Sequence, residues 1–213
     1  MSGETNLADS SIRDYLAQLA SSSPTPGGGS CAALSAALGA GLINMVCALT
    51  VGRKRFAQHE VLLTDTMQSL RTLSTRLTAL VDEDAHAYDR VMTAFQLPRY
   101  SEAEKENRRR SIQNALVPAT ETPLEIVDCC REALGLAESL LGKLNPNVLS
   151  DLAAGIDLVA ASAHAASHNA DVNIAMMLDD EMKARYTERT RAALAEVDEL
   201  AARVRAGLAS DVG

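Results

Sequence analysis

The sequence is poor in aromatic residues, with no tryptophan, two phenylalanines and four tyrosines among its 213 residues. Strands draw on aromatic and β-branched side chains, whereas alanine and leucine, which recur throughout this chain, favour helices. No segment has the alternating pattern of a β-strand, and the chain shows no internal repeat. The composition predicts an all-α protein in which the whole chain, residues 1–213, forms a single helical domain.

Excess positive charge and a secretory signal are also lacking. The chain carries 20 Lys and Arg against 28 Asp and Glu, a formal net charge of −8, whereas nucleic-acid binding favours a basic face. Its first twenty residues contain no apolar stretch of the kind that opens a secreted protein. The four cysteines have no zinc-type spacing and are expected to be buried, reduced thiols: Cys31, Cys47, Cys129 and Cys130. We therefore expect a cytoplasmic protein that does not bind nucleic acid.

Helices are expected from periodicity and from capping, glycine and proline signals. A Ser-x-x-Glu pattern at 101–104 is a capping box that opens one helix, which Pro118 is expected to end. Thr122 followed by Pro123 indicates the start of another. The expected helices cover 10–20, 30–51, 59–95 (whole or with a small break), 101–118, 122–142, the stretch from a turn at 145–147 to about 169, and 179–208.

Residues 31–51, CAALSAALGAGLINMVCALTV, contain no charged side chain and are followed by the basic run RKR at 53–55. The length and the basic flank would suit a transmembrane helix. However, alanine outnumbers leucine and isoleucine, Asn44 lies in the middle, and the surrounding amphipathic helices need a core to cover. We therefore expect a buried central helix of small residues in a helical bundle, with no membrane insertion. Small residues four apart also favour close helix contact, with a dimer seam as one candidate.

Three consecutive glycines, Gly27 to Gly29, come directly before this helix. Backbone N–H groups at a helix start are free to bind an anion or a polar ligand edge, and glycine permits close backbone approach. No Lys-Ser/Thr pair follows and no strand precedes, so the segment is neither a Walker A loop nor a dinucleotide-binding motif. Two interpretations stay open on physical grounds: a flexible entry turn, or the rim of a ligand site.

Several motifs together resemble a known family. They are PTPGGGSCAALSAALGAGL followed by GRKRF, then VDEDAHAYDRVMTAFQLP, VPATETPLEIVD, NPNVLSDLAAG and HNADVNIAMMLDDE. The chain resembles the cyclodeaminase/cyclohydrolase family, which comprises the C-terminal domain of formiminotransferase-cyclodeaminase and stand-alone bacterial relatives such as methenyltetrahydrofolate cyclohydrolases. The resemblance implies an all-helical homodimer that acts on a one-carbon derivative of tetrahydrofolate, with a site near the glycine turn and no metal or redox cofactor.

The resemblance leaves the reaction open. Because the chain stands alone, hydrolysis of 5,10-methenyltetrahydrofolate to 10-formyltetrahydrofolate is expected over release of ammonia by a formimidoyltetrahydrofolate cyclodeaminase. A catalytically silent folate-binding helical protein is a further alternative. The sequence also departs from the family pattern at four positions, where small or apolar residues are usual: Cys31, His164, His168 and Asp171.

Both reactions pass through a tetrahedral carbon flanked by two nitrogens, so each needs a base and an acid, which carboxylates can supply. Asp84 is one catalytic candidate, because it shares a helix face with Tyr88, Val91 and Phe95 that looks inward. Asp151 is the other; it falls at a helix start, where a role as a cap or dipole partner is the alternative.

The resemblance and the helix spacing also suggest which residues contact the substrate. Asp151 and Asn169 are separated by roughly 27 Å of helix, so one subunit cannot bring both to the same carbon. The basic run at 53–55 would likewise reach a folate tail only across subunits. His164 and His168 have metal-ligand spacing but no third ligand, so no metal site is expected. The substrate-binding candidates are Gly27, Gly28, Gly29, Ser30, Tyr88, Asn169 and Asn173.

Overall fold

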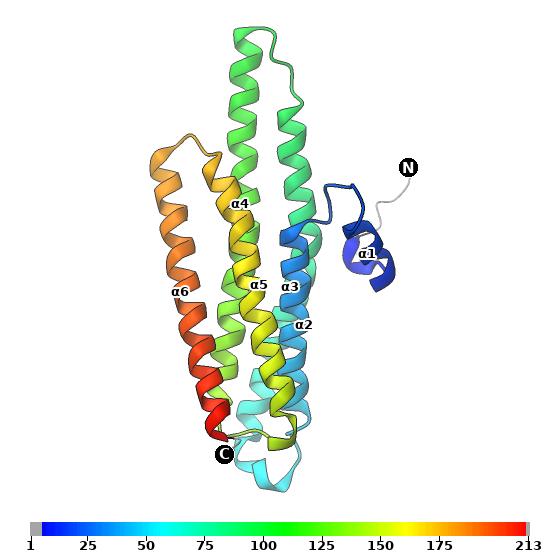
Figure 1. The fold of residues 1–213 in the computed structure, drawn as a ribbon, viewed down its shortest axis with the longest axis vertical. Coiled ribbons are helices and arrows are strands. Elements are labelled where there is room, and N and C mark those ends of the chain that lie inside the picture. The colour runs from blue at the N-terminus through cyan, green and yellow to red at the C-terminus, as the bar shows by residue number, and fades with distance from the viewer. Residues whose placement is uncertain (1–5, 212–213) are drawn as a thin grey trace.

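The computed structural model describes residues 6–211, and every regular element among them is a helix, which confirms the all-α prediction. Five long helices are joined by short connections, and one short helix precedes them (Figure 1). The elements in chain order are η1 (Leu7–Asp9), α1 (Ile12–Leu19), α2 (Gly28–Ala48), η2 (Lys54–His59), α3 (Glu60–Phe95), α4 (Glu102–Ser139), η3 (Pro146–Val148), α5 (Leu149–Ala175) and α6 (Asp180–Asp211).

The long helices run side by side as an elongated bundle (Figure 1). α2 descends from the middle of the bundle, and α5 climbs back beside it. The hairpin of α3 and α4 projects beyond the start of α2 and the end of α5, so these four elements come together above the middle of the bundle. α1 lies outside the bundle, close to the start of α2. This convergence positions the candidate site.

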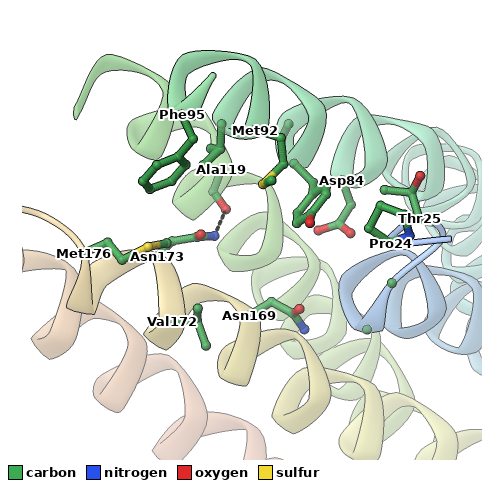
Figure 2. A pocket seen from close by; sticks show the side chains of 15 residues that line it. Pro24, Thr25, Asp84, Met92, Phe95, Ala119, Asn169, Val172, Asn173 and Met176 are labelled. Carbon is green, nitrogen blue, oxygen red and sulfur yellow. Dashed lines mark hydrogen bonds between the residues drawn. The ribbon is translucent and has the colours of Figure 1, made fainter. Parts of the chain in front are cut away.

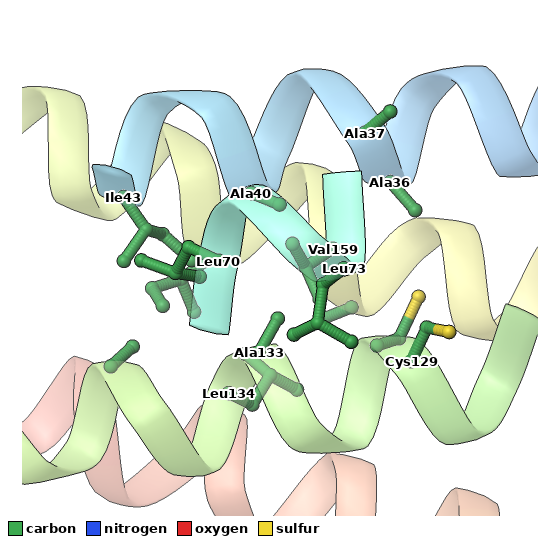
Figure 3. Packing of buried hydrophobic residues seen from close by; sticks show 14 of the residues in the cluster. Ala36, Ala37, Ala40, Ile43, Leu70, Leu73, Cys129, Ala133, Leu134 and Val159 are labelled. Atoms are coloured by element: carbon green, nitrogen blue, oxygen red, sulfur yellow. The ribbon is translucent and has the colours of Figure 1, made fainter. Parts of the chain in front are cut away.

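The central helix is α2, which packs against α3 on one side and α5 on the other. Its small residues let the neighbouring helices approach closely, as Figure 3 shows for Ala36 and Ala40. A Cβ on Gly39 would lie 2.6 Å from Val159 Cγ2 and 2.8 Å from the carbonyl oxygen of Gly155. The expected central helix of small residues is therefore present, and glycine is required at its crossing with α5.

Two segments, Gly28–Ala48 and Pro146–Ala175, are long and apolar enough to span a membrane by length and composition. Within the bundle, 44% of the most apolar window of the first and 50% of that of the second are buried. Core helices of soluble proteins meet the same criterion. The burial expected for 31–51 holds for the face of α2 that packs on α3 and α5, whereas Leu38 and Met45 on the other face are exposed. The absence of membrane insertion stays a prediction.

The prediction that Pro118 ends one helix and Pro123 begins another is wrong: α4 is continuous through both prolines. Each proline removes one backbone hydrogen bond of the helix. The loss is offset at Pro123, because the carbonyl of Ala119, four residues earlier, accepts a 2.6 Å hydrogen bond from Asn173 Nδ2 of α5. Leu116 and Leu124 are buried on either side of this stretch. Packing therefore outweighs the local signals.

The remaining helices differ from expectation mainly at their ends. α5 does not stop near Asn169 but runs to Ala175, which places Asn173 on the same helix. α3 is one unbroken helix, and the capping box at Ser101 and Glu104 is present at the start of α4. The expectation of buried thiols is confirmed for Cys47, Cys129 and Cys130. Cys31 is only half-buried.

Gly39→Ala tests the close crossing of α2 and α5. The added methyl group collides with Val159 and with the Gly155 backbone, so we expect a loss of about 1–3 kcal/mol in the free energy of unfolding. Gly135→Ala in α4 is the matched control, because its Cβ would meet no atom within 4 Å, and a gain of up to about 1 kcal/mol is expected. Urea titration followed by circular dichroism measures both. Equal stability of the two variants would contradict the crossing.

Candidate active site

A cavity of about 380 Å³ lies where the start of α2 meets α3, α4 and α5 (Figure 2). This volume is within the range of small-molecule sites. Its walls come from four parts of the chain that are far apart in sequence. They are Pro24, Thr25, Gly27 and Gly28 before and at the start of α2; Asp84, Ala87, Tyr88, Val91, Met92 and Phe95 of α3; Ala119 of α4; and Asn169, Val172, Asn173 and Met176 of α5.

Asp84 faces the start of α2, and its carboxylate is held there by one backbone donor. Ser30 N donates to Asp84 Oδ2 at 2.9 Å. A Cβ on Gly29 would collide with the Asp84 carboxyl group, so only glycine permits this approach. Burial raises the pKa of Asp84, and the Ser30 hydrogen bond only partly opposes that rise. The cavity thus contains one oriented carboxylate that is easier to protonate than an ordinary aspartate.

Ser30 and Gly29, both expected to contact substrate, lie behind Asp84 instead of lining the cavity. Ser30 is fully buried, and its Oγ lies 3.2 Å from the hydroxyl of Tyr15, which is itself buried. Tyr15 therefore connects α1 to Ser30 at the glycine turn, and the backbone N–H of Ser30 connects the turn to Asp84. No sequence motif pointed to Tyr15, which is the one buried residue of the short helix α1.

The two asparagines of α5 both line the cavity, one helical turn apart. The Asn169 side chain packs against Gly28, where a Cβ would lie 3.1 Å from Asn169 Nδ2. Asn173 Nδ2 donates to the Ala119 carbonyl, the acceptor that Pro123 leaves without a helix partner. Asn173 therefore holds α5 against α4 at the cavity wall, whereas Asn169 faces the glycine turn (Figure 2).

The outer part of the cavity is apolar. Tyr88, Val91 and Phe95 follow Asp84 along α3 on one face, as the spacing predicts. Seven wall residues were not predicted from the sequence: Pro24, Thr25, Ala87 and Ala119 and, in this outer part, Met92, Val172 and Met176. The only available signal for the last two was their helical spacing from Asn169 and Asn173. The contrast between a polar inner end and an apolar outer end suits a flat ligand with two chemically different halves.

Among the residues that the structure describes, no lysine or arginine lines the cavity, and Asp84 is the only carboxylate that does. A carboxylate without a basic partner in an apolar cavity favours a positively charged ligand, because an opposite charge nearby offsets the cost of burying the ionised form. This charge pattern is the most informative property of the site.

The other catalytic candidate, Asp151, does not line the cavity. It lies in the first turn of α5, at the opposite end of that helix from Asn169. The basic run at 53–55 is at the same lower end, beside the turn that contains Pro146. A catalytic role for Asp151 stays a prediction, because within one chain Asp151 does not reach the cavity.

Within residues 6–211, no group of three or more His, Cys, Asp or Glu side chains is arranged to hold a metal ion. The paired histidines of α5 do not converge on one. His164 Nε2 lies 2.8 Å from Asp198 Oδ1 of α6, and His168 is exposed. The polar partner of His164 is therefore Asp198 of α6, and this contact links α5 to α6.

Asp84→Asn is expected to stabilise the protein in a pH-dependent way. Because the pKa of Asp84 is higher in the folded chain than in the unfolded one, its contribution to stability falls as pH rises above the ordinary aspartate range. The amide is neutral at every pH and still accepts the Ser30 hydrogen bond. The variant should therefore melt above the wild type at pH 7–8, with the difference shrinking as pH approaches 4. Asp89→Asn, exposed on the same helix, is the control; a variant less stable than wild type at neutral pH would contradict this.

Comparison with known proteins agrees with this architecture. Residues 11–192 match the family described as formiminotransferase-cyclodeaminase. A crystal structure of formiminotetrahydrofolate cyclodeaminase from Thermotoga maritima superposes with a TM-score of 0.86 at 24% identity, covering 96% of this chain and 98% of that one. At this identity, the likeness shows a shared fold.

Two curated relatives are similar in sequence. The chain is 42% identical over 169 residues to methenyltetrahydrofolate cyclohydrolase of Methylorubrum extorquens, covering 79% of this chain and 81% of that protein. It is 31% identical over 201 residues to formimidoyltransferase-cyclodeaminase of Mus musculus, covering 94% of this chain but only 37% of the mouse protein. The chain therefore belongs to the formiminotransferase-cyclodeaminase family.

Proposed function

We propose that the protein hydrolyses the cyclic amidinium of 5,10-methenyltetrahydrofolate to give 10-formyltetrahydrofolate. The observation that carries this proposal is the charge pattern of the cavity: its described lining residues include one carboxylate, Asp84, and no lysine or arginine. The bridging carbon of the substrate lies between two nitrogens that share a positive charge, and such a delocalised cation suits this site. The similarity to a relative named methenyltetrahydrofolate cyclohydrolase supports the same reaction.

The two ends of the cavity suit the two ends of the substrate. The backbone at Gly27 and Gly28, with the Asn169 amide opposite, offers polar groups and space for the edge of a pterin ring. Val91, Phe95 and the neighbouring apolar side chains suit the aminobenzoyl ring beyond it. The bridging carbon between these two rings then lies near the Asp84 carboxylate.

Asp84 can serve as base and then as acid. Its Oδ2 is held by Ser30 N, which leaves Oδ1 to accept a proton from the attacking water as the water oxygen bonds to the bridging carbon. The tetrahedral carbon then expels the pterin nitrogen N5, which takes the proton back from Asp84. The remaining hydroxyl proton passes to solvent as the formyl C=O forms on N10. The raised pKa of Asp84 makes both transfers easier near neutral pH.

Asp84→Asn should lower kcat for methenyltetrahydrofolate hydrolysis by roughly 10²- to 10⁴-fold, the usual contribution of a general acid–base residue. The loss of near-ultraviolet absorbance of the substrate measures the rate, and circular dichroism checks that the helical fold is kept. Asp89→Asn should retain wild-type activity. A fully active Asp84→Asn variant would remove this residue from the mechanism.

The cyclodeaminase reaction is the second candidate, since the mouse relative is named for it. Ammonia release from 5-formimidoyltetrahydrofolate, measured beside hydrolysis, separates the two. If wild-type protein accelerates neither reaction above its uncatalysed rate, the enzyme hypothesis fails. Calorimetry with tetrahydrofolate would then test whether the chain is a silent folate-binding protein.

We also propose that the protein works as a cytoplasmic homodimer. α2 carries no charged residue, yet Leu38 is 58% exposed and Met45 37% exposed on its outer face. Exposed helix faces of soluble proteins normally carry charges. Between these two residues, a Cβ on Gly41 would meet no atom within 4 Å, so a second helix has room to approach. Only across such an interface would Asp151 or the basic run at 53–55 reach a cavity.

Gly41→Glu should therefore weaken self-association without disturbing the fold of a single chain, because a charge would be buried unpaired at the interface. Sedimentation velocity at micromolar concentration measures the oligomeric state. Gly135→Glu in α4 is the matched control and should sediment like wild type, since a Cβ there also meets no atom within 4 Å. A monomeric wild type would overturn the dimer, and sedimentation with membranes after a high-salt wash would instead indicate a membrane contact for α2.

A further inference from the structure

The tail of the proposed substrate ends in carboxylates, yet none of the residues that line the cavity is a lysine or an arginine. A side chain of the same subunit that binds the tail must then lie just outside the cavity. The polar inner end, at Gly28 and Asp84, suits the pterin and the reacting carbon, so the tail leaves by the apolar outer end, where Phe95 forms part of the wall.

Arg108, in the second turn of α4, lies against this outer wall. Its Nε donates to the Phe95 carbonyl oxygen at 3.1 Å, and its guanidinium carbon is 5.4 Å from the centroid of the Phe95 ring. These two contacts hold the side chain at the end of α3, against a residue of the cavity wall. The guanidinium is thus placed before any ligand binds.

Arg108 also differs from Lys105 and Arg109, two basic residues near it in the sequence, because each of those forms an ion pair with a glutamate. Lys105 pairs with Glu102 at 2.6 Å, and Arg109 pairs with Glu106 at 2.8 Å. Within the part of the chain that the structure describes, Arg108 has no carboxylate partner, and its only hydrogen bond is the one made by Nε. Both Nη atoms remain available, the arrangement with which arginine binds a carboxylate through two parallel hydrogen bonds.

The distances suit a folate. Asp84 and Phe95 are eleven residues apart on α3, which corresponds to about 16 Å along the helix axis. An extended aminobenzoyl-glutamate places its first carboxylate on the order of 10 Å from the bridging carbon, from ordinary bond lengths. The side chains at the two ends fill the rest of the span, so one ligand can contact Asp84 with its reacting carbon and Arg108 with its tail.

We propose that Arg108 binds the tail carboxylate of the folate substrate and thereby selects glutamate-bearing folates over compounds without the glutamate. This assignment rests on the proposed function, since it requires a folate in the cavity. It makes Arg108 a specificity-determining residue remote from the chemistry, because a contact of equal strength in the ground state and the transition state changes KM and leaves kcat unchanged.

The test compares methenyltetrahydrofolate with the methenyl derivative of tetrahydropteroate, which lacks the glutamate. Arg108→Ala should raise KM for the glutamate-bearing compound roughly 5- to 30-fold, leave kcat within about twofold, and leave KM for the pteroate compound unchanged. Arg108→Lys should recover part of the loss, because it keeps the charge without the planar fork. Arg109→Ala, whose partner is Glu106, is the matched control and should behave as wild type.

Calorimetry with tetrahydrofolate and tetrahydropteroate gives the same comparison without turnover. If wild-type protein has no activity but binds tetrahydrofolate more tightly than tetrahydropteroate, and Arg108→Ala removes that preference, the reaction is wrong and the tail site stands. Equal losses for both compounds in Arg108→Ala would mean that Arg108 only supports Phe95. That result, or a wild type that does not distinguish the two compounds, would overturn the proposal.

Discussion

The hydrogen bond from Ser30 N to the Asp84 carboxylate is the contact on which the site depends. It joins the first turn of α2 to the middle of α3, and it exists only because Gly29 has no side chain in the way. The same bond engages one carboxylate oxygen of Asp84, Oδ2. Tyr15 supports it from behind through the Ser30 hydroxyl, which explains why a short outer helix is tied to the bundle at this point.

A second constraint sets the opposite wall. Pro123 deprives the Ala119 carbonyl of its partner inside α4, and Asn173 of α5 supplies one. Pro123 therefore frees a carbonyl of α4 at the edge of the cavity. The Asn173 side chain of α5 donates to that carbonyl, and this hydrogen bond connects the two helices. These two hydrogen bonds, from Ser30 and from Asn173, therefore join the four parts of the cavity in pairs, α2 with α3 and α4 with α5.

The sequence predicted the fold class and one wall of the site, but not the contacts between helices that hold the site together. Alanine-rich composition and the periodicity from residue 59 to 95 were enough for the all-helical fold and for the face shared by Asp84, Tyr88 and Phe95. The local proline signals at 118 and 123 misled, because the compensating contact comes from a residue some fifty positions away. Likewise, nothing local indicates that Ser30 is buried behind Asp84, since its partner Tyr15 belongs to a separate helix.

In the proposed mechanism Asp84, whose pKa is raised by burial, accepts and returns the proton during hydrolysis of a methenyl folate. The pH dependence of kcat/KM for methenyltetrahydrofolate, after subtraction of the uncatalysed rate, tests it most directly. The rate should rise with pH through a pKa above the ordinary aspartate value, and this rise should be lost in Asp84→Asn. A profile that is flat across this range in the wild type, or identical in the two proteins, would contradict it.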